Sequence, residues 1–142
     1  MNDLERVRQH DGPVVIDIET PGQVDPYALD ARVLMIGVAL SNVEAYVFST
    51  EDDIQPLLDV LRTKKLIAHN AKFERNWLRK AYQFEGDFIA DTMLLSHYVN
   101  EKQPTGLEAL AQLLFDAPPY GEDIDYVNEP WESYAAYCAA DC

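Results

Sequence analysis

The chain opens with short apolar runs that favour strands over helices. Residues 14–18 (VVIDI) and 33–40 (VLMIGVAL) are rich in branched aliphatic side chains, which is typical of buried strands. Ser41 and Asn42 then predict a tight turn, because asparagine tolerates the left-handed conformation that such turns need. Residues 43–48 (VEAYVF) would return as a third strand, so the first three strands can form an antiparallel meander.

Helical spacing begins in the next segment. Residues 51–63 are predicted to form a helix with Thr50 as its N-cap, and acidic residues fill its first turn. Pro56 lies inside this segment, so the helix is expected to start later or to kink. Residues 65–68 (KLIA) predict a fourth short strand.

A second helix is expected over residues 71–83, with Asn70 as its N-cap. Phe73, Trp77 and Ala81 recur along it at a spacing of four residues, which predicts one apolar face. The remaining expected elements are a short strand at 88–89, a helix over 92–99 capped by Asp91, a helix from Thr105 to Leu114 with a Thr105/Glu108 capping box, a loop over 116–129, and a last helix capped by Asn128 with Pro130 in its first turn.

This order of elements predicts a single α/β domain over residues 1–142. Its mixed central sheet would have about five strands, the first three antiparallel, flanked by helices. Apolar residues make up 48% of the chain, which is enough to bury a core. The chain has no apolar stretch long enough for a membrane helix, and its polar N-terminal residues lack a signal-peptide core. We therefore expect a soluble cytoplasmic protein with no membrane partner.

Charge is distributed unevenly along the chain. Acidic residues outnumber basic residues 25 to 11, for a net charge of −14, whereas proteins that bind long duplexes are usually basic. Seven of the eleven basic residues lie between Arg62 and Lys80. This run is either a solvated helix face or part of a binding surface. Divalent cations in an acidic site, or a partner protein, could offset the remaining negative charge.

Cys138 and Cys142 lie four residues apart in the last predicted helix. A disulfide between them would need unfavourable geometry, and a zinc site would need more ligands than two thiols. The sequence therefore predicts two free thiols.

Asp17 and Glu19 end the first predicted strand and share one of its faces, because side chains two residues apart point the same way. Two carboxylates at the end of a buried strand resist joint ionisation, and a divalent cation relieves that cost. The alternative is that the strand ends there and both acids face water.

Two further patterns offer oxygen ligands. Glu74 follows Asn70 at the start of a predicted helix, where it could bind a metal or simply interact with the helix dipole. Tyr137 and Asp141 lie four residues apart and share a helical face, so they could supply a hydroxyl and a metal ligand. The alternative for this pair is a core tyrosine beside an exposed aspartate.

The order and spacing of these patterns resemble the proofreading 3′–5′ exonuclease domain of family A DNA polymerases. This family belongs to the tyrosine-containing (DEDDy) branch of the DEDD exonuclease superfamily, which also includes ribonuclease D. VVIDIET matches its Asp-x-Glu motif, HNAKFE its Asn-x-Lys-aromatic-acid motif, and YCAAD its Tyr-x-x-x-Asp motif. The ADTMLLSHYVN segment resembles the polymerase branch more than the ribonuclease D branch. The resemblance extends from about residue 14 to the end of the chain, and it implies a ribonuclease H-like fold.

The resemblance also implies roles for individual residues. Asp17 would bridge two Mg²⁺ or Mn²⁺ ions, Glu19 and Asp141 would help hold the first ion, and Glu74 would hold the second through water. Tyr137 would position the attacking water. Substrate contacts would come from Thr20, Asn70, Lys72 and Phe73.

Two departures from the family pattern change these expectations. Glu74 stands where the family usually has aspartate, and its longer side chain could weaken the second metal site. The chain ends one residue after Asp141, although the matching family helix continues. We therefore expect a domain truncated in its last helix, whose missing packing comes from a longer polymerase or from another subunit.

The expected function is two-metal-dependent hydrolysis from the 3′ end of single-stranded DNA, releasing nucleoside 5′-monophosphates in association with a DNA polymerase. One alternative is a weakly active or inactive exonuclease fold that serves as a scaffold in a replication complex. The other is a ribonuclease D-like RNA exonuclease, because the sequence does not indicate how a 2′-hydroxyl is treated.

Overall fold

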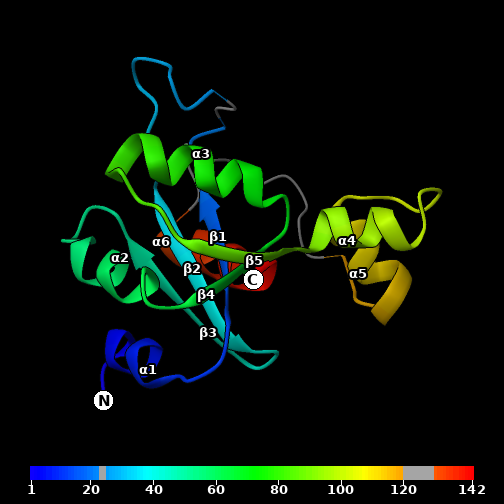
Figure 1. Cartoon of the computed structure of the whole chain (residues 1–142), viewed down its shortest axis with the longest axis horizontal. Coiled ribbons are helices and arrows are strands. Elements are labelled where there is room, and N and C mark those ends of the chain that lie inside the picture. Colours follow the sequence, from blue (N-terminus) through cyan, green and yellow to red (C-terminus); the bar gives the residue numbers. More distant parts are fainter. Residues whose placement is uncertain (23–24, 120–129) are drawn as a thin grey trace.

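A computed structural model describes residues 1–22, 25–119 and 130–142 of the chain (Figure 1). It contains a five-stranded sheet with helices on both faces, which confirms the predicted α/β architecture. In chain order the elements are α1 (Asp3–Gln9), β1 (Val14–Glu19), β2 (Met35–Ser41), β3 (Glu44–Ser49), α2 (Gln55–Leu61), β4 (Lys65–Ala68), α3 (Ala71–Tyr82), β5 (Asp87–Asp91), α4 (Thr92–Val99), α5 (Leu107–Phe115) and α6 (Trp131–Asp141).

The strand order in the sheet is β3-β2-β1-β4-β5. Strands β1, β2 and β3 form the predicted antiparallel meander, while β1 pairs with β4, and β4 with β5, in parallel. The register places Asp17 of β1 opposite Gly37 of β2. The sheet is therefore mixed, with β1 in its centre.

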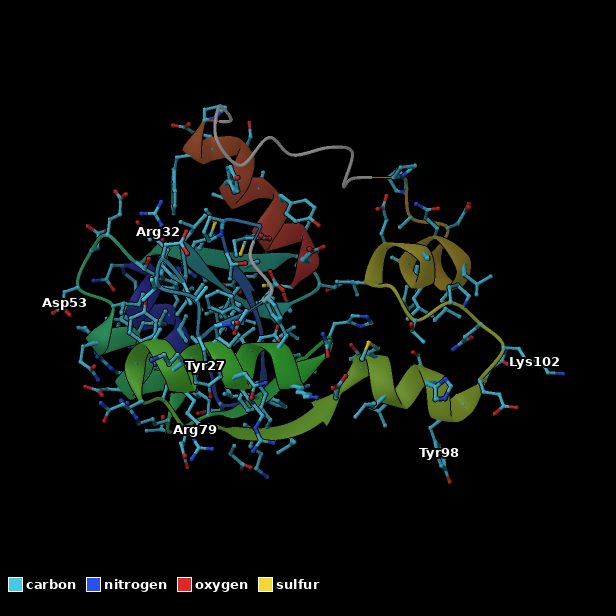
Figure 2. The ribbon with its side chains drawn as sticks, turned by 90° about the horizontal axis from the view of Figure 1, so that it is seen from above. Tyr27, Arg32, Asp53, Arg79, Tyr98 and Lys102 are labelled. Atoms are coloured by element: carbon cyan, nitrogen blue, oxygen red, sulfur yellow. The ribbon has the colours of Figure 1, made fainter. Side chains whose placement is uncertain are left out.

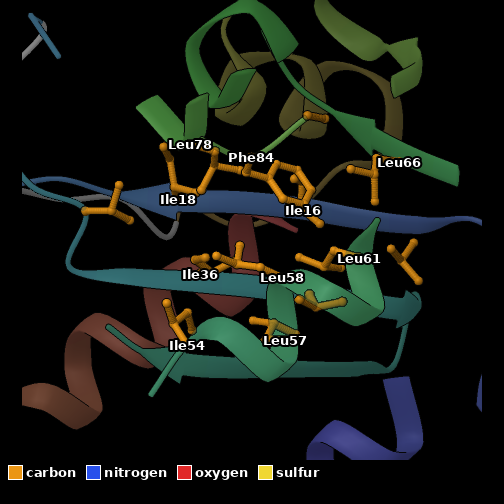
Figure 3. Close-up of a cluster of buried hydrophobic side chains, with 14 of the residues drawn as sticks. Ile16, Ile18, Ile36, Ile54, Leu57, Leu58, Leu61, Leu66, Leu78 and Phe84 are labelled. Carbon is orange, nitrogen blue, oxygen red and sulfur yellow. The ribbon is translucent and has the colours of Figure 1, made fainter. Parts of the chain in front are cut away.

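The main core lies between one face of the sheet and helices α1, α2 and α3 (Figure 3). Val14, Ile16 and Ile18 of β1 all point into this core and are at most 4% exposed. Because strand side chains alternate, Asp17 and Glu19 point to the opposite face, which α6 covers. Figure 2 shows α6 and α3 on opposite sides of the sheet. The alternation along β1 thus decides which layer meets its carboxylates.

Helix α1 was not expected from the sequence. The side chain of Asn2 caps it by accepting a hydrogen bond from the Glu5 backbone N–H at 2.9 Å, and Val7 is fully buried against the main core. The signal in the sequence was an asparagine N-cap followed by apolar residues at helical spacing, hidden among charged side chains.

The prediction of Thr50 as the N-cap of the next helix was wrong, whereas the later start expected from Pro56 is confirmed. Helix α2 begins at Gln55, with Pro56 in its first turn. The Thr50 hydroxyl instead donates to the carbonyl oxygens of Val33 at 2.6 Å and Leu34 at 3.0 Å. Proline is tolerated in a first turn because the N–H that it lacks would have no helical partner there.

The N-cap of α3 also differs from the prediction. Asn70 adopts a left-handed conformation with φ of 65°, and its side chain makes no capping hydrogen bond. The Asp91 carboxylate replaces it by accepting hydrogen bonds from Asn70 N at 3.0 Å and Ala71 N at 2.9 Å. The same carboxylate caps α4, as predicted, by accepting from Met93 N and Leu94 N at 3.0 and 3.3 Å. One side chain therefore holds the starts of two helices.

Replacing Asp91 with alanine is expected to lower the free energy of unfolding by about 2–4 kcal/mol, because two caps worth about 1–2 kcal/mol each are lost together. Urea unfolding followed by circular dichroism measures this change. The matched control is Asp87→Ala at the exposed start of the same strand, which should cost less than about 0.5 kcal/mol. Equal losses for the two variants would contradict the double cap.

Helices α4 and α5 form a pair that projects from the sheet, with Tyr98 and Lys102 at its far end (Figure 2). His69 ties this pair to the domain, since its Nε2 lies 2.7 Å from the Thr105 carbonyl oxygen and its Nδ1 lies 2.9 Å from the Thr92 hydroxyl. The predicted Thr105/Glu108 capping box is absent, because α5 starts after Gly106 with no side-chain cap among the described residues.

The last helix begins later than predicted. Helix α6 starts at Trp131 and has Pro130 at its N-cap position, so Pro130 does not lie in the first turn. The predicted cap Asn128, and residues 120–129 of the predicted loop, lie outside the described residues. Within the described part of the chain, every helix is too short or too polar to cross a membrane.

Candidate metal centre

Asp17 and Glu19 lie at the C-terminal end of the central strand, on the face that α6 covers. Glu19 is only 6% exposed, and the next residue, Thr20, is 7% exposed. Asp17 is partly buried. The alternative in which this strand ends and both acids face water is therefore wrong for Glu19.

Helix α6 brings the last motif over this strand end. Tyr134 and Cys138 are buried against Met35 and Val47, and this small second core fixes the helix to the sheet. Asp141, one turn after Tyr137 on the same helical face, is partly exposed at the end of α6. Two segments from opposite ends of the chain therefore meet here.

Gly37 makes this close approach possible. A Cβ atom at position 37 would lie 2.6 Å from Cys142 Sγ and 2.8 Å from Cys138 Sγ. It would also lie 3.1 Å from the Cys138 carbonyl oxygen. This last contact involves backbone, which cannot rotate away, so a side chain at position 37 would have to displace α6 by a few tenths of an ångström. Gly37 thus sets the distance between α6 and the Asp17 strand.

Replacing Gly37 with serine is expected to lower the free energy of unfolding by about 1–3 kcal/mol, the usual cost of overpacking a core. It should also reduce metal binding, because α6 carries Asp141. Urea unfolding and a calorimetric Mn²⁺ titration measure the two effects. Gly106→Ser is the matched control, since a Cβ there meets nothing within 4 Å. A Gly37→Ser protein as stable as this control would contradict the packing argument.

Glu74 enters the site from α3, on the other side of the sheet end. Its side chain is only 2% exposed, and its Oε2 atom is buried without a hydrogen-bond partner among the described residues. The buried stripe of α3 runs through Ala71, Glu74, Trp77 and Leu78, so the predicted stripe was wrong in including Ala81, which is exposed. A carboxylate on the buried stripe is not explained by the helix dipole alone.

Electrostatics link all four acids. Burial raises the pKa of Asp17 well above its usual range, and the negative charges of Cys142, Glu19, Asp141 and Glu74 raise it further, in that order. Burial, with a smaller effect of Asp141, raises the pKa of Glu19 to about 7. The carboxylates from β1, α3 and α6 are therefore close enough to oppose one another's ionisation.

The pKa of Glu74 is raised to about 8, chiefly by burial and to a smaller extent by the charge of Asp91. A hydrogen bond from its own backbone N–H partly opposes this rise. An acid that is buried, lacks a partner for one oxygen and resists ionisation is stabilised when a cation binds beside it.

The donor set fits a hard divalent cation. Oxygen ligands from Asp17, Glu19, Glu74 and Asp141 suit Mg²⁺ or Mn²⁺, and the mutual repulsion of these acids is relieved by positive charge. The unpartnered Glu74 oxygen is an available ligand for an ion or for its bound water.

One side chain in this group was not expected to have a role. The Cys138 thiol points at Asp17, with Sγ 3.8 Å from Oδ2, and ligand atoms of Asp17, Glu19 and Cys138 lie within 4.8 Å of one another. Its sequence signal was its place three residues before Asp141, which puts both on neighbouring faces of one helix.

The four predicted substrate-binding residues have different surroundings. Thr20 is buried beside Glu19, and Asn70 and Phe73 flank the start of α3, where the Phe73 ring lies 6.0 Å from the Trp77 ring. Lys72 instead lines a cleft of about 730 Å³ between α3 and β5, together with Arg75 and Arg79. The basic run seen in the sequence therefore includes an exposed row on α3.

Comparison with known proteins adds to this geometry. The profile of the family described as 3′–5′ exonuclease matches residues 1–142. Among curated protein sequences, none matches the chain significantly.

Solved structures with a similar fold are nucleases and a polymerase. NrnC from Brucella melitensis is 21% identical, with a TM-score of 0.78 over 99% of this chain and 71% of that one. Other structures of NrnC contain Mg²⁺ or pGG. RNase D from Escherichia coli is 16% identical, with a TM-score of 0.71 over 96% of this chain and 37% of that one. The POL domain of Pol1 from M. smegmatis is also 16% identical, with a TM-score of 0.62 over 80% of this chain and 20% of that one. These likenesses agree with the expected ribonuclease H-like fold.

Proposed function

Because the chain belongs to the 3′–5′ exonuclease family, the domain family found in family A DNA polymerases, we propose that it releases nucleoside 5′-monophosphates from the 3′ end of single-stranded DNA. The observation that supports this proposal most is that Asp17 and Glu19 end β1 on the face covered by α6, and that the charges of Glu19, Asp141 and Glu74 all raise the pKa of Asp17. Such a set of oxygen ligands is costly to keep in a core without a bound cation.

Asp17, Glu19 and Asp141 would hold one divalent cation, and Asp17 and Glu74 a second. Bound cations in such a site make water nucleophilic and neutralise the charge that develops on the leaving oxygen. Burial raises the pKa of Glu19 to about 7 and that of Glu74 to about 8, so bound cations would be needed to keep both acids fully ionised near neutral pH.

Tyr137 would orient the attacking water. Tyr137 lies one helical turn before Asp141, and a phenol can accept one hydrogen bond from water while donating another. Thr20, Asn70 and Phe73 would hold the terminal nucleotide, since they surround the same strand and helix ends. Lys72 would act further from the reaction, where its charge favours the phosphate backbone.

A single-stranded RNA is the second candidate substrate. NrnC and RNase D match more of this chain than Pol1 does, which favours a domain that acts apart from a polymerase. We propose association with a polymerase domain or subunit only if the substrate is DNA.

The test uses matched single-stranded DNA and RNA oligonucleotides labelled at the 5′ end. With Mg²⁺ we expect a ladder of products shortened from the 3′ end and release of 5′-monophosphates, faster for DNA. A 3′-phosphate on the oligonucleotide, or added EDTA, should stop the reaction. Faster cleavage of RNA would favour the second candidate, and endonucleolytic fragments would contradict both.

The non-enzymatic alternative is an inactive exonuclease fold that serves as a scaffold in a replication complex. A calorimetric Mn²⁺ titration separates it from the nuclease, since a scaffold has no reason to bind the ion. Absence of binding at millimolar Mn²⁺ together with absence of cleavage would establish that alternative.

A further inference from the structure

The thiol of Cys138 lies where the carboxylates of the metal centre converge. Cys138 is fully buried, and its Sγ atom lies 3.8 Å from Asp17 Oδ2. Together with Glu19, these residues offer three ligand atoms within 4.8 Å of one another. Sulfur is a soft ligand, whereas Mg²⁺ takes oxygen, so this thiol has no task in the site proposed above.

The position of the thiol follows from the packing of α6. Cys138 faces β2 at Gly37, and Gly37 lies opposite Asp17 in the sheet register. The absence of a side chain at position 37 leaves the sulfur directly above the strand pair. The thiol and the carboxylates therefore share one space between the helix and the sheet.

A second observation indicates that this space favours a cation. The Oε2 atom of Glu74 is buried without a hydrogen-bond partner in the described part of the chain, and Glu74 is close enough for its charge to act on Asp17. An unpartnered carboxylate oxygen in a site already crowded with acids is compensated by positive charge.

We propose that Asp17, Glu19 and Cys138 form a binding site for a thiophilic divalent cation such as Zn²⁺ or Cd²⁺, which displaces Mg²⁺ from the shared carboxylates and inhibits the nuclease. The binding part stands on the geometry alone, while the inhibition rests on the proposed function. The thiophilic ion and the first Mg²⁺ would use the same Asp17 and Glu19 oxygens, so these two ions compete for one position.

Distances support this ligand set. With Zn–O of about 2.1 Å and Zn–S of about 2.3 Å, a tetrahedral ion separates oxygen from sulfur by about 3.6 Å. The observed separation of 3.8 Å between Cys138 Sγ and Asp17 Oδ2 is close to that value. On binding, the S–H bond of Cys138 breaks, the proton leaves to solvent, and a sulfur–metal bond forms without any change in oxidation state.

The direct test is a Cd²⁺ titration of the full chain, kept reduced with a phosphine, in buffer without Mg²⁺. A cadmium–thiolate bond absorbs ultraviolet light by charge transfer, so one equivalent of Cd²⁺ should produce this absorption in the wild type. Cys138→Ser should abolish it. Cys142→Ser is the matched control, because the Cys142 thiol also lies against Gly37 but is not one of the three grouped ligands, so this variant should retain the absorption.

Affinity gives a second measurement that does not depend on the folding of the Cys138 variant. Asp17→Asn keeps the thiol but removes a ligand, so it should weaken Cd²⁺ binding by about tenfold or more. Inhibition is read as the Zn²⁺ concentration that halves each variant's own rate in Mg²⁺, and Cys138→Ser should raise that concentration by about tenfold or more over the wild type.

Several outcomes would overturn the proposal. Equal absorption in Cys138→Ser and wild type, or loss of the absorption in Cys142→Ser with retention in Cys138→Ser, would remove Cys138 from the site. A full cadmium signal in a wild-type protein without nuclease activity would contradict the proposed function but leave the metal site intact. A wild-type protein with nuclease activity but without a cadmium signal would support the proposed function and contradict the thiophilic metal site.

Discussion

Replacing Asp17 with asparagine is expected to slow Mg²⁺-dependent release of nucleotides by at least about 1000-fold, which corresponds to about 4 kcal/mol of lost transition-state stabilisation. Asparagine keeps the size of the side chain and removes its charge. Asp17 is the acid on which the charges of Glu19, Asp141 and Glu74 all act, so its loss affects every ligand of the centre. Rates from single-turnover assays on a labelled oligonucleotide measure the effect.

The same variant also separates loss of chemistry from loss of folding. Without metal, Asp17→Asn should be at least as stable as the wild type, because it removes a carboxyl that burial keeps from ionising. Asp11→Asn, at an exposed position before the same strand, is the control and should keep its full rate. A rate within tenfold of the wild type for Asp17→Asn would exclude the proposed metal mechanism.

The metal-free protein is expected to lose several kcal/mol of stability between about pH 4.5 and pH 8. Burial raises the pKa values of Glu19 and Glu74 from the usual 4.5 to about 7 and about 8, so in this window the folded state holds protons that the unfolded state releases. The free energy of unfolding must then fall as pH rises, by about 1.36 kcal/mol for each unit by which folding raises the pKa of an acid. Urea unfolding in EDTA at a series of pH values measures the slope.

Two additions to this experiment identify the groups responsible. Glu74→Gln should flatten the slope above pH 7, since glutamine does not titrate and Glu74 has the higher of the two values. Saturating Mg²⁺ should restore stability at pH 8, because metal binding favours the ionised acids. A metal-free protein that becomes more stable from pH 5 to pH 8 would show that these acids are solvated.

The sheet and the acidic motifs could be predicted because their signals are local. Alternation along β1 separates Ile16 and Ile18 from Asp17 and Glu19, and this pattern alone assigns the acids to one face. The family resemblance then related Glu74 and Asp141 to the same centre. Both predictions, the shared face of the strand acids and the grouping of the four acids, depend on residue spacing within short segments, which can be read from the sequence.

Helix starts were predicted less well, because tertiary contacts decided them. Thr50 was expected as a cap, but its hydroxyl donates to the carbonyl oxygens of residues 33 and 34. Asn70 was also expected as a cap, but the Asp91 carboxylate at the C-terminal end of the neighbouring strand takes that role. The local preference for a capping residue does not determine which side chain, near or distant in sequence, accepts the hydrogen bonds of the helix N-terminus.

The role of the thiol could not be predicted for a similar reason. Cys138 and Cys142 had no further ligand within their own segment, so they were expected to be ordinary free thiols, and both are indeed unbridged. The oxygen ligands come from a strand 121 positions earlier. Only the glycine at position 37, which admits the sulfur to the strand pair, makes this proximity possible.

The dependence of the centre on α6 also has a consequence during translation. Ribosomes add about 5–20 residues per second, so the β1–β3 meander emerges seconds before Asp141 is made. A nascent chain can therefore bury Ile16 and Ile18 while it still lacks the helix that carries its last acid. The acidic centre would therefore be complete only once that helix has docked on the sheet.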